Sequence, residues 1–192
     1  MNCECFSVKK EDMCVTAAKN GHLECLKYAH KNGCSWDEET CNWAAVNGHL
    51  NCLKYAHENG CPWDKWTCHW AAGKGHLECL KYAHKNGCHW DEWTCTWGAR
   101  NGHLNCLKYA HENGCPWNSK TVDDTVLFTQ WPCAIYAIEN GCPHKLEDIP
   151  SDLKKILMHR KARRLFPVLS GALRQRGKNK QTQTEIIVRN KY

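Results

Sequence analysis

The chain has 192 residues, 16 cysteines and a formal net charge of +6. The charge is unevenly distributed: residues 1–144 carry 13 Lys/Arg against 16 Asp/Glu, whereas residues 145–192 carry 13 against 4, so a mildly acidic body precedes a strongly basic end. Because the sequence shows no secretory signal and no run of the roughly 18 apolar residues that a membrane span needs, we expect an intracellular, cytoplasmic or nuclear protein with reduced thiols.

A period of 27 residues organises the chain. Shifting the sequence by this period superposes Gly21 on Gly48, Gly75 and Gly102, together with two series of cysteines. A fixed period of this size indicates stacked structural repeats. After an N-terminal cap at residues 1–10, the period places five repeats at 11–36, 37–63, 64–90, 91–117 and 118–144.

The second unit illustrates the structure expected of every repeat. Asp37 is a candidate N-cap for a first helix over residues 38–46, and the Asn-Gly pair that ends at Gly48 stops this helix. A second helix is expected over residues 49–58. Trp63 follows it in the connection, where an aromatic wedge packs between neighbouring repeats. The unit is a helix-turn-helix.

The string WAAVNGHLNCLKYAHENGCPWD resembles the ankyrin repeat. This resemblance implies an all-α solenoid, closed by a C-terminal helix, that binds other proteins and is not catalytic. Since 27 residues leave no room for the usual β-hairpin finger, the chain is most similar to the short, Cys- and Trp-rich ankyrin-like repeats of giant DNA viruses and some protists.

A variable stripe on the first helices predicts a partner-binding surface, because residues that differ between repeats are free to specify a partner. The stripe follows the spacing i, i+3, i+7 and comprises Glu39, Asn42, Val46, Trp66, His69, Trp93, Thr96 and Arg100. Trp66 and Trp93 are its candidate anchors, since exposed aromatics dominate many interfaces; the alternative is that they pack on the adjacent loop. The resemblance adds Asn47, Lys74 and Asn101, which flank the same surface.

The cysteines are expected to be structural thiols rather than metal ligands. No Cys-x-x-Cys pair occurs, and the candidate ligands within one repeat, such as Cys52 and His57, lie on different sides of a helix. A small buried thiol behaves as an apolar side chain. We therefore expect no metal and no cofactor. Since no catalytic motif is present, we also expect no enzyme.

The C-terminal region predicts one helix, from Ser151 to about Arg164, that caps the array. LEDIPSDLKKIL, residues 146–157, also resembles the opening of an F-box, which implies docking onto a ubiquitin-ligase adaptor through Ile149, Leu153, Ile156 and Leu157. Two basic clusters, at residues 159–164 and 174–180, make nucleic-acid binding a further alternative. Residues 145–173 are assigned to the capping region and residues 174–192 to a flexible basic tail.

The sequence thus favours a non-catalytic protein-protein interaction module. Its expected partner is a protein of unknown identity, and the expected state is a monomer. A ligase adaptor with an F-box-like helix and a nucleic-acid binder that uses the basic tail are the two alternatives.

Overall fold

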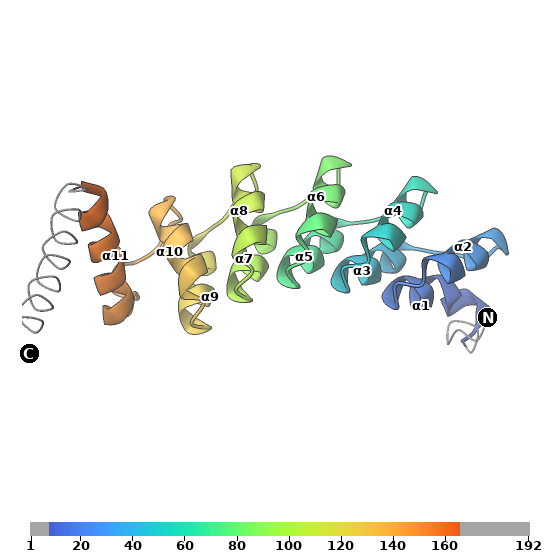
Figure 1. The fold of residues 1–192 in the computed structure, drawn as a ribbon, viewed down its shortest axis with the longest axis horizontal. Coiled ribbons are helices and arrows are strands. Elements are labelled where there is room, and N and C mark those ends of the chain that lie inside the picture. Colours follow the sequence, from blue (N-terminus) through green and yellow to red (C-terminus); the bar gives the residue numbers. More distant parts are fainter. Residues whose placement is uncertain (1–7, 166–192) are drawn as a thin grey trace, which may run out of the picture. The chain divides into compact units, whose positions relative to one another are not determined.

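The computed structural model describes residues 8–165, which form eleven α-helices, one short 3-10 helix and no strand. Ten of the helices stand in five consecutive antiparallel pairs, as Figure 1 shows. The pairs are α1 (Met13–Lys19) with α2 (Leu23–Lys31), α3 (Glu38–Val46) with α4 (Leu50–Glu58), α5 (Lys65–Gly73) with α6 (Leu77–Lys85), α7 (Glu92–Arg100) with α8 (Leu104–Glu112), and α9 (Ser119–Leu127) with α10 (Trp131–Glu139). The predicted all-α solenoid without long hairpins is confirmed.

The repeated polar residues begin and end the helices as the period predicts. The Asp37 carboxylate accepts a hydrogen bond from the Glu39 amide at 3.1 Å, and Asp64 does the same for Trp66 at 3.0 Å. These caps satisfy amide groups that the first turn of a helix leaves unpaired. Gly48 turns the chain between α3 and α4 with φ +74°, a conformation that glycine adopts without a steric penalty.

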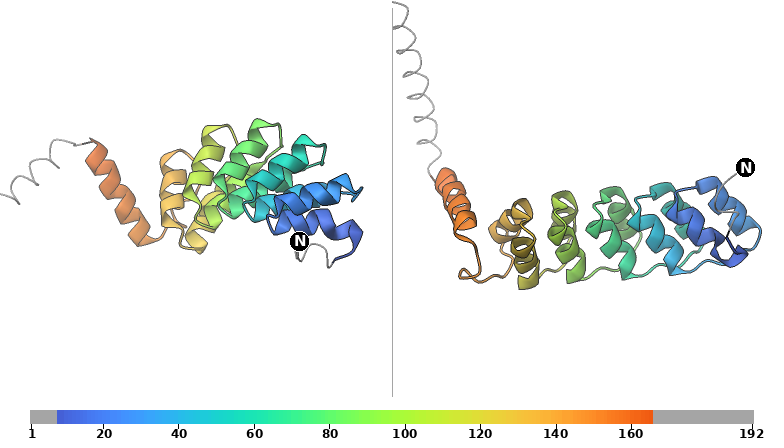
Figure 2. Two further views of the ribbon diagram at one scale, coloured as in Figure 1. Left: turned by 45° about the vertical axis from the view of Figure 1, so that its right-hand side comes forward. Right: turned by 90° about the horizontal axis from the view of Figure 1, so that it is seen from below.

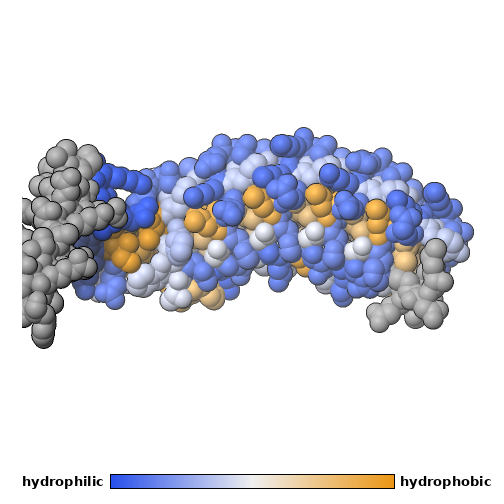
Figure 3. Space-filling view, in the orientation of Figure 1, coloured by the Kyte–Doolittle hydropathy of each residue, from blue (hydrophilic) through white to orange (hydrophobic). Residues whose placement is uncertain are grey.

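Small side chains fill the core of the array. Ala44, Ala45 and Cys41 of α3 are fully buried, and Leu53 is the large buried residue of α4. Small residues allow the paired helices to approach closely, and each pair covers its apolar surfaces with its neighbours. Some hydrophobic residues still reach the surface. On the side of the array shown in Figure 3, hydrophobic patches recur from pair to pair within a hydrophilic surface.

Neighbouring second helices are joined by an arrangement that we call the aromatic clasp. In one copy, His57 at the end of α4 stacks on Trp63 with ring centroids 3.7 Å apart, and its Nδ1 lies 3.0 Å from the Tyr82 hydroxyl of α6. The edge of Tyr82 also meets Trp63 at 6.1 Å. The other copies are His30/Trp36/Tyr55, His84/Trp90/Tyr109 and His111/Trp117/Tyr136. Trp63 and its equivalents are therefore packed between repeats, as predicted.

The last pair departs from the pattern of the others. Thr129 stands where the earlier repeats have glycine, yet it keeps a left-handed φ of +56°. This conformation is unfavourable for a β-branched residue. The fifth repeat thus keeps the geometry of the turn although it lacks the glycine that favours this geometry.

The region after the array forms a separate unit that begins at Ile149. It contains α11 (Ser151–Leu165), close to the helix expected from Ser151 to Arg164. The expected flexible tail at residues 174–192 lies outside the described residues, as does most of the expected N-terminal cap at residues 1–10.

Within residues 8–165, no helix has both the length and the apolar composition to cross a membrane. Figure 2 shows the helix pairs from two further directions.

Candidate functional site

The outward surface of the first helices follows the spacing i, i+4, i+8, whereas the predicted stripe followed i, i+3, i+7. The outward side chains of α5 and of the residue that follows it are Trp66, Trp70 and Lys74, which follow the spacing i, i+4, i+8. Trp66 and Lys74 are exposed and Trp70 is half-buried. The equivalent residues are Glu39, Trp43 and Asn47 around α3, and Trp93, Trp97 and Asn101 around α7. The predicted surface residues at both ends of each helix therefore lie on this surface, together with exposed Arg100 and half-buried Val46.

The middle members of the predicted stripe do not lie on an open face, because they contact the next repeat. His69 and Thr96 are each only 1% exposed, and Asn42 is half-buried. Asn42 accepts a hydrogen bond from the Thr67 hydroxyl at 2.7 Å, and Thr96 shares one with Thr121 at 3.0 Å. These three residues vary between repeats because each makes a different contact with the next repeat, and the expectation that they form a free surface is corrected.

Five tryptophans make up what we call the tryptophan face: Trp43, Trp66, Trp70, Trp93 and Trp97. Trp66 is 43% exposed and Trp93 is 39% exposed, and the other three are half-buried. The rings of Trp66 and Trp70 lie 6.4 Å apart within α5, and Trp70 meets Trp97 of the next repeat edge to face at 5.1 Å. The face is therefore continuous between the third and the fourth repeat.

Sequence reasoning missed Trp43, Trp70 and Trp97 as surface residues. They recur in three consecutive repeats, and residues that repeat are typical of contacts that maintain the stack. The helical wheel alone does not separate the two sets, since i, i+3, i+7 spans about 60° of the helix circumference and i, i+4, i+8 spans about 80°.

Positive side chains lie beside this face. Lys19 Nζ is 4.4 Å from the ring centroid of Trp43, and Lys120 Nζ is 5.9 Å from that of Trp93. Cations attract the negative faces of aromatic rings at such distances. Arg100 lies over the Phe128 ring at 4.2 Å and within 4.0 Å of the carboxylate of Asp124. The arrangement combines exposed indoles with exposed basic head groups.

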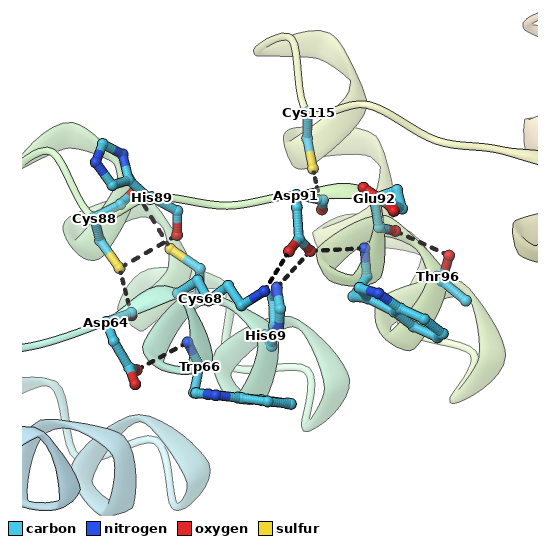
Figure 4. Close-up of polar contacts among 12 residues, drawn as sticks. Asp64, Trp66, Cys68, His69, Cys88, His89, Asp91, Glu92, Thr96 and Cys115 are labelled. Atoms are coloured by element: carbon cyan, nitrogen blue, oxygen red, sulfur yellow. Dashed lines mark hydrogen bonds and ion pairs between the residues drawn. The ribbon is translucent and has the colours of Figure 1, made fainter.

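Asp91 is the centre of a hydrogen-bond network between α5 and the start of α7, as Figure 4 shows. Its carboxylate accepts hydrogen bonds from the Trp93 amide at 3.0 Å and from Lys65 Nζ at 3.0 Å, and it lies 2.8 Å from His69 Nε2. Burial opposes the charged form of Asp91, but the donors from Lys65, Trp93 and His69 outweigh it and lower the pKa of this carboxyl group. The network connects α5 to the start of α7 and holds the backbone of Trp93 in position.

His69 is a neutral donor in this network rather than a cation. Burial lowers its pKa, and the nearby Asp91 carboxylate only partly offsets that effect. The second ring nitrogen, Nδ1, is buried without a hydrogen-bond partner, and protonation would leave a buried N–H unpaired.

Acidification is therefore expected to destabilise the array. Because the folded state keeps His69 neutral while an unfolded histidine binds a proton below about pH 6.5, stability should fall as the pH decreases from 7.5 to 5.5. Burial lowers the pKa of His84 and of His103 in the same direction. We expect the thermal midpoint to decrease by a few degrees, on the order of 2–4 °C for each kcal/mol lost.

His69→Asn is the matched variant, because the equivalent residue of the second repeat is Asn42. Asn42 accepts a hydrogen bond from Thr67 of the next repeat. The variant should lose less of its thermal midpoint between the two pH values than the parent chain does. An unchanged pH dependence would mean that His69 does not titrate differently in the two states.

The buried cysteines have the properties of structural side chains. Cys61 Sγ donates to the Asp37 carbonyl at 3.1 Å, and Cys88 repeats this contact with Asp64 at 3.1 Å. Burial raises the pKa of Cys52 to about 11 and, with a smaller contribution from Glu78, that of Cys79 to about 12. Metal ligation and thiol reactivity require the thiolate, which these shifts disfavour at neutral pH. In residues 8–165, no three His, Cys, Asp or Glu side chains gather as a potential metal site.

The four residues of the F-box-like segment are not uniformly accessible. Ile149 is 3% exposed and Leu153 is fully buried, whereas Ile156 and Leu157 have intermediate exposure. The basic residues 160–164 of α11 are exposed, and the second basic cluster lies outside the described residues.

Comparison with known proteins identifies the type of repeat. Residues 14–92 match the family described as ankyrin repeats (3 copies). No curated protein matches the chain. Among solved structures, the crystal structure of the human ASB11 ankyrin repeat domain is similar, with a TM-score of 0.60, 17% sequence identity, and coverage of 68% of this chain and 69% of that one. At this identity the likeness shows the fold alone.

Proposed function

Since residues 14–92 carry ankyrin repeats, which generally mediate protein-protein interaction, we propose that this chain is a non-catalytic binding module that recognises a protein partner through the tryptophan face. The observation that carries the proposal is the exposure of Trp66 and Trp93 at equivalent positions of adjacent repeats. Aromatic side chains on a rigid surface are typical binding anchors, because they bury a large area at a small cost in conformational entropy.

The network beneath the anchors supports their role. Asp64 and Asp91 cap the helices that carry Trp66 and Trp93, and the stacked helix pairs hold both residues at a fixed separation. Preorganised surfaces gain affinity because less freedom is lost on binding. Beside the tryptophan face, the exposed side chains of Lys74 and Asn101 are available for polar contacts with the partner.

The 27-residue period and the abundance of Cys and Trp support assignment to the short repeats found in giant DNA viruses and some protists. The proposed compartment is accordingly intracellular, in the cytoplasm of the host cell if the source is viral. The module would act as a monomeric scaffold or adaptor.

Affinity capture from cell lysate tests the proposal. The intact chain, the Trp66→Ala/Trp93→Ala variant and a deletion of residues 165–192 are used as baits after nuclease treatment, and captured proteins are identified by mass spectrometry. We expect the deletion to retain the partner and the double variant to lose it by tenfold or more, which corresponds to about 1.4 kcal/mol of binding free energy.

Tyr28→Ala is the matched control, because Tyr28 is an aromatic residue that is 51% exposed on a second helix. It should retain the partner. Loss of all capture after the tail deletion or the nuclease treatment would instead place the function in the basic C-terminal region, and equal capture by the double variant would exclude the tryptophan face.

A further inference from the structure

The spacing of the exposed indoles specifies the shape of a binding segment. Trp66 and Trp93 occupy the same position in consecutive repeats, and α5 packs directly beside α7 through the contact of Trp70 with Trp97. Packed helices lie about 8–10 Å apart, so the two exposed indoles are separated by about 9 Å along the array. A ligand that contacts both indoles with equivalent residues must repeat its own surface at this distance.

A polyproline II segment has this repeat. It has three residues per turn and rises 3.1 Å per residue, so every third side chain recurs on one face about every 9.3 Å. A β-strand repeats its face after about 6.7 Å and falls out of step with the second indole. An α-helix repeats after 5.4 Å, so only every second turn would meet an indole.

The chemistry of the face also suits such a segment. Aromatic surfaces recognise proline-rich segments because the proline ring offers a flat apolar surface and the extended conformation is already formed before binding. The backbone of this conformation makes no internal hydrogen bonds, which leaves its carbonyl groups available to the donors of indole and lysine side chains. Trp66, Trp93 and Lys74 provide exposed donors of these kinds.

The exposed basic side chains near Trp66 and Trp93 indicate which residues would lie between the prolines of such a segment. The side chains of Lys65, Arg100 and Lys120 are 50%, 44% and 50% exposed, whereas their carboxylate partners Asp91 and Asp124 are only 27% and 8% exposed. Around Trp66 and Trp93 the cations are therefore more exposed than their carboxylate partners, of which Asp91 is partly and Asp124 almost fully covered. The exposed Glu39 of this surface lies in the preceding repeat. An acidic residue of the ligand would pair with these head groups, and a basic one would be repelled.

From the spacing and the charges we propose that the occupant of the tryptophan face is an acidic, proline-rich segment of the partner protein in the polyproline II conformation, with prolines three residues apart. Consecutive prolines stack on Trp66 and Trp93, and intervening acidic residues meet Lys65, Arg100 and Lys120. This inference rests on the proposed function and narrows it to one class of ligand.

Fluorescence anisotropy with labelled synthetic peptides tests the inference on the full chain. The probe carries prolines three residues apart with glutamates between them. One control peptide has the same composition with prolines two residues apart, and a second has lysine in place of glutamate. We expect the probe to bind at least tenfold more tightly than either control, and Trp66→Ala/Trp93→Ala to weaken it at least tenfold while Tyr28→Ala leaves it unchanged.

The peptide-binding assay and the lysate capture together test this inference separately from the proposed function. Equal affinity for the three peptides would overturn the polyproline assignment, and so would equal affinity of the probe for the parent chain and the double variant. Tighter binding of an amphipathic helical peptide or of single-stranded nucleic acid would overturn it as well. If lysate capture still requires Trp66 and Trp93 in that case, the binding module stands and only the ligand class is wrong. If capture is also independent of both residues, both statements fail.

Discussion

Replacing Gly75 with alanine is expected to destabilise the array by about 2–4 kcal/mol, since two costs combine at this turn. Gly75 has a φ of +80°, which costs an L-amino acid about 1–2 kcal/mol. A Cβ atom there would also lie 2.5 Å from Nδ1 of His103, the ring that packs over the turn from the next repeat. Displacing this ring would disturb the contact between the two repeats at this turn.

Gly87→Ala separates the two costs. Gly87 has a nearly identical φ of +84°, but nothing lies within 4 Å of the position that a Cβ atom would take. Urea unfolding of the two variants should therefore show a loss of about 1 kcal/mol for Gly87→Ala and a clearly larger loss for Gly75→Ala. Equal losses would show that the His103 ring yields without cost and does not lock adjacent repeats together.

Two tryptophans that lie three residues apart are expected to have opposite roles. Trp90 belongs to an aromatic clasp: it stacks on His84 with centroids 3.8 Å apart and meets the edge of Tyr109 at 6.3 Å. Trp90→Ala should lower the free energy of unfolding by about 2–4 kcal/mol, because it opens a space between two repeats and removes the ring from His84. Below the melting transition, partner capture should be retained.

Trp93→Ala is the comparison, because its ring is 39% exposed on the tryptophan face. We expect a loss of about 1 kcal/mol or less in stability and a marked loss of partner capture. Thermal melting by circular dichroism, followed by capture at a temperature where both variants are folded, measures both effects. A large loss of stability for Trp93→Ala would show that this ring is part of the core, which was the alternative reading of its sequence position.

The helix pairs could be predicted from the sequence because their signals are local and repeat in register. Asp37, the Asn-Gly pair at Gly48 and Pro62 each mark the beginning or end of a helix in a way that does not depend on distant residues. Four near-identical copies remove most of the ambiguity that a single helix boundary leaves. The all-α solenoid followed directly.

The orientation of the first helices could not be derived in the same way. Each first helix is covered on most sides, so the pattern of apolar residues does not show which narrow sector stays open. Variability pointed to His69 and Thr96, but these residues differ because they meet different partners in the next repeat. Conversely, Trp70 and Trp97 recur and yet border the open surface.

Contacts between repeats also depend on a register that the sequence does not show. The Thr67 hydroxyl donates to Asn42 of the previous repeat. The residue equivalent to Asn42 one repeat earlier is Val15, which cannot accept a hydrogen bond, and the hydroxyl of Thr40 is buried without a partner. Thr94 is likewise unpaired, because His69 reaches Asp91 instead. The identity of one residue in the preceding repeat thus decides whether a buried hydroxyl is satisfied.

Site-specific photo-crosslinking tests the central claim most directly, namely that the partner lies on the first-helix side of the array. A photoreactive amino acid is placed at position 74 or at position 85, which are exposed lysines after α5 and at the end of α6 in the same helix pair. After irradiation with the captured partner, position 74 should give a covalent adduct and position 85 should not. Adducts from position 85 alone would contradict the account and place the partner on the second helices.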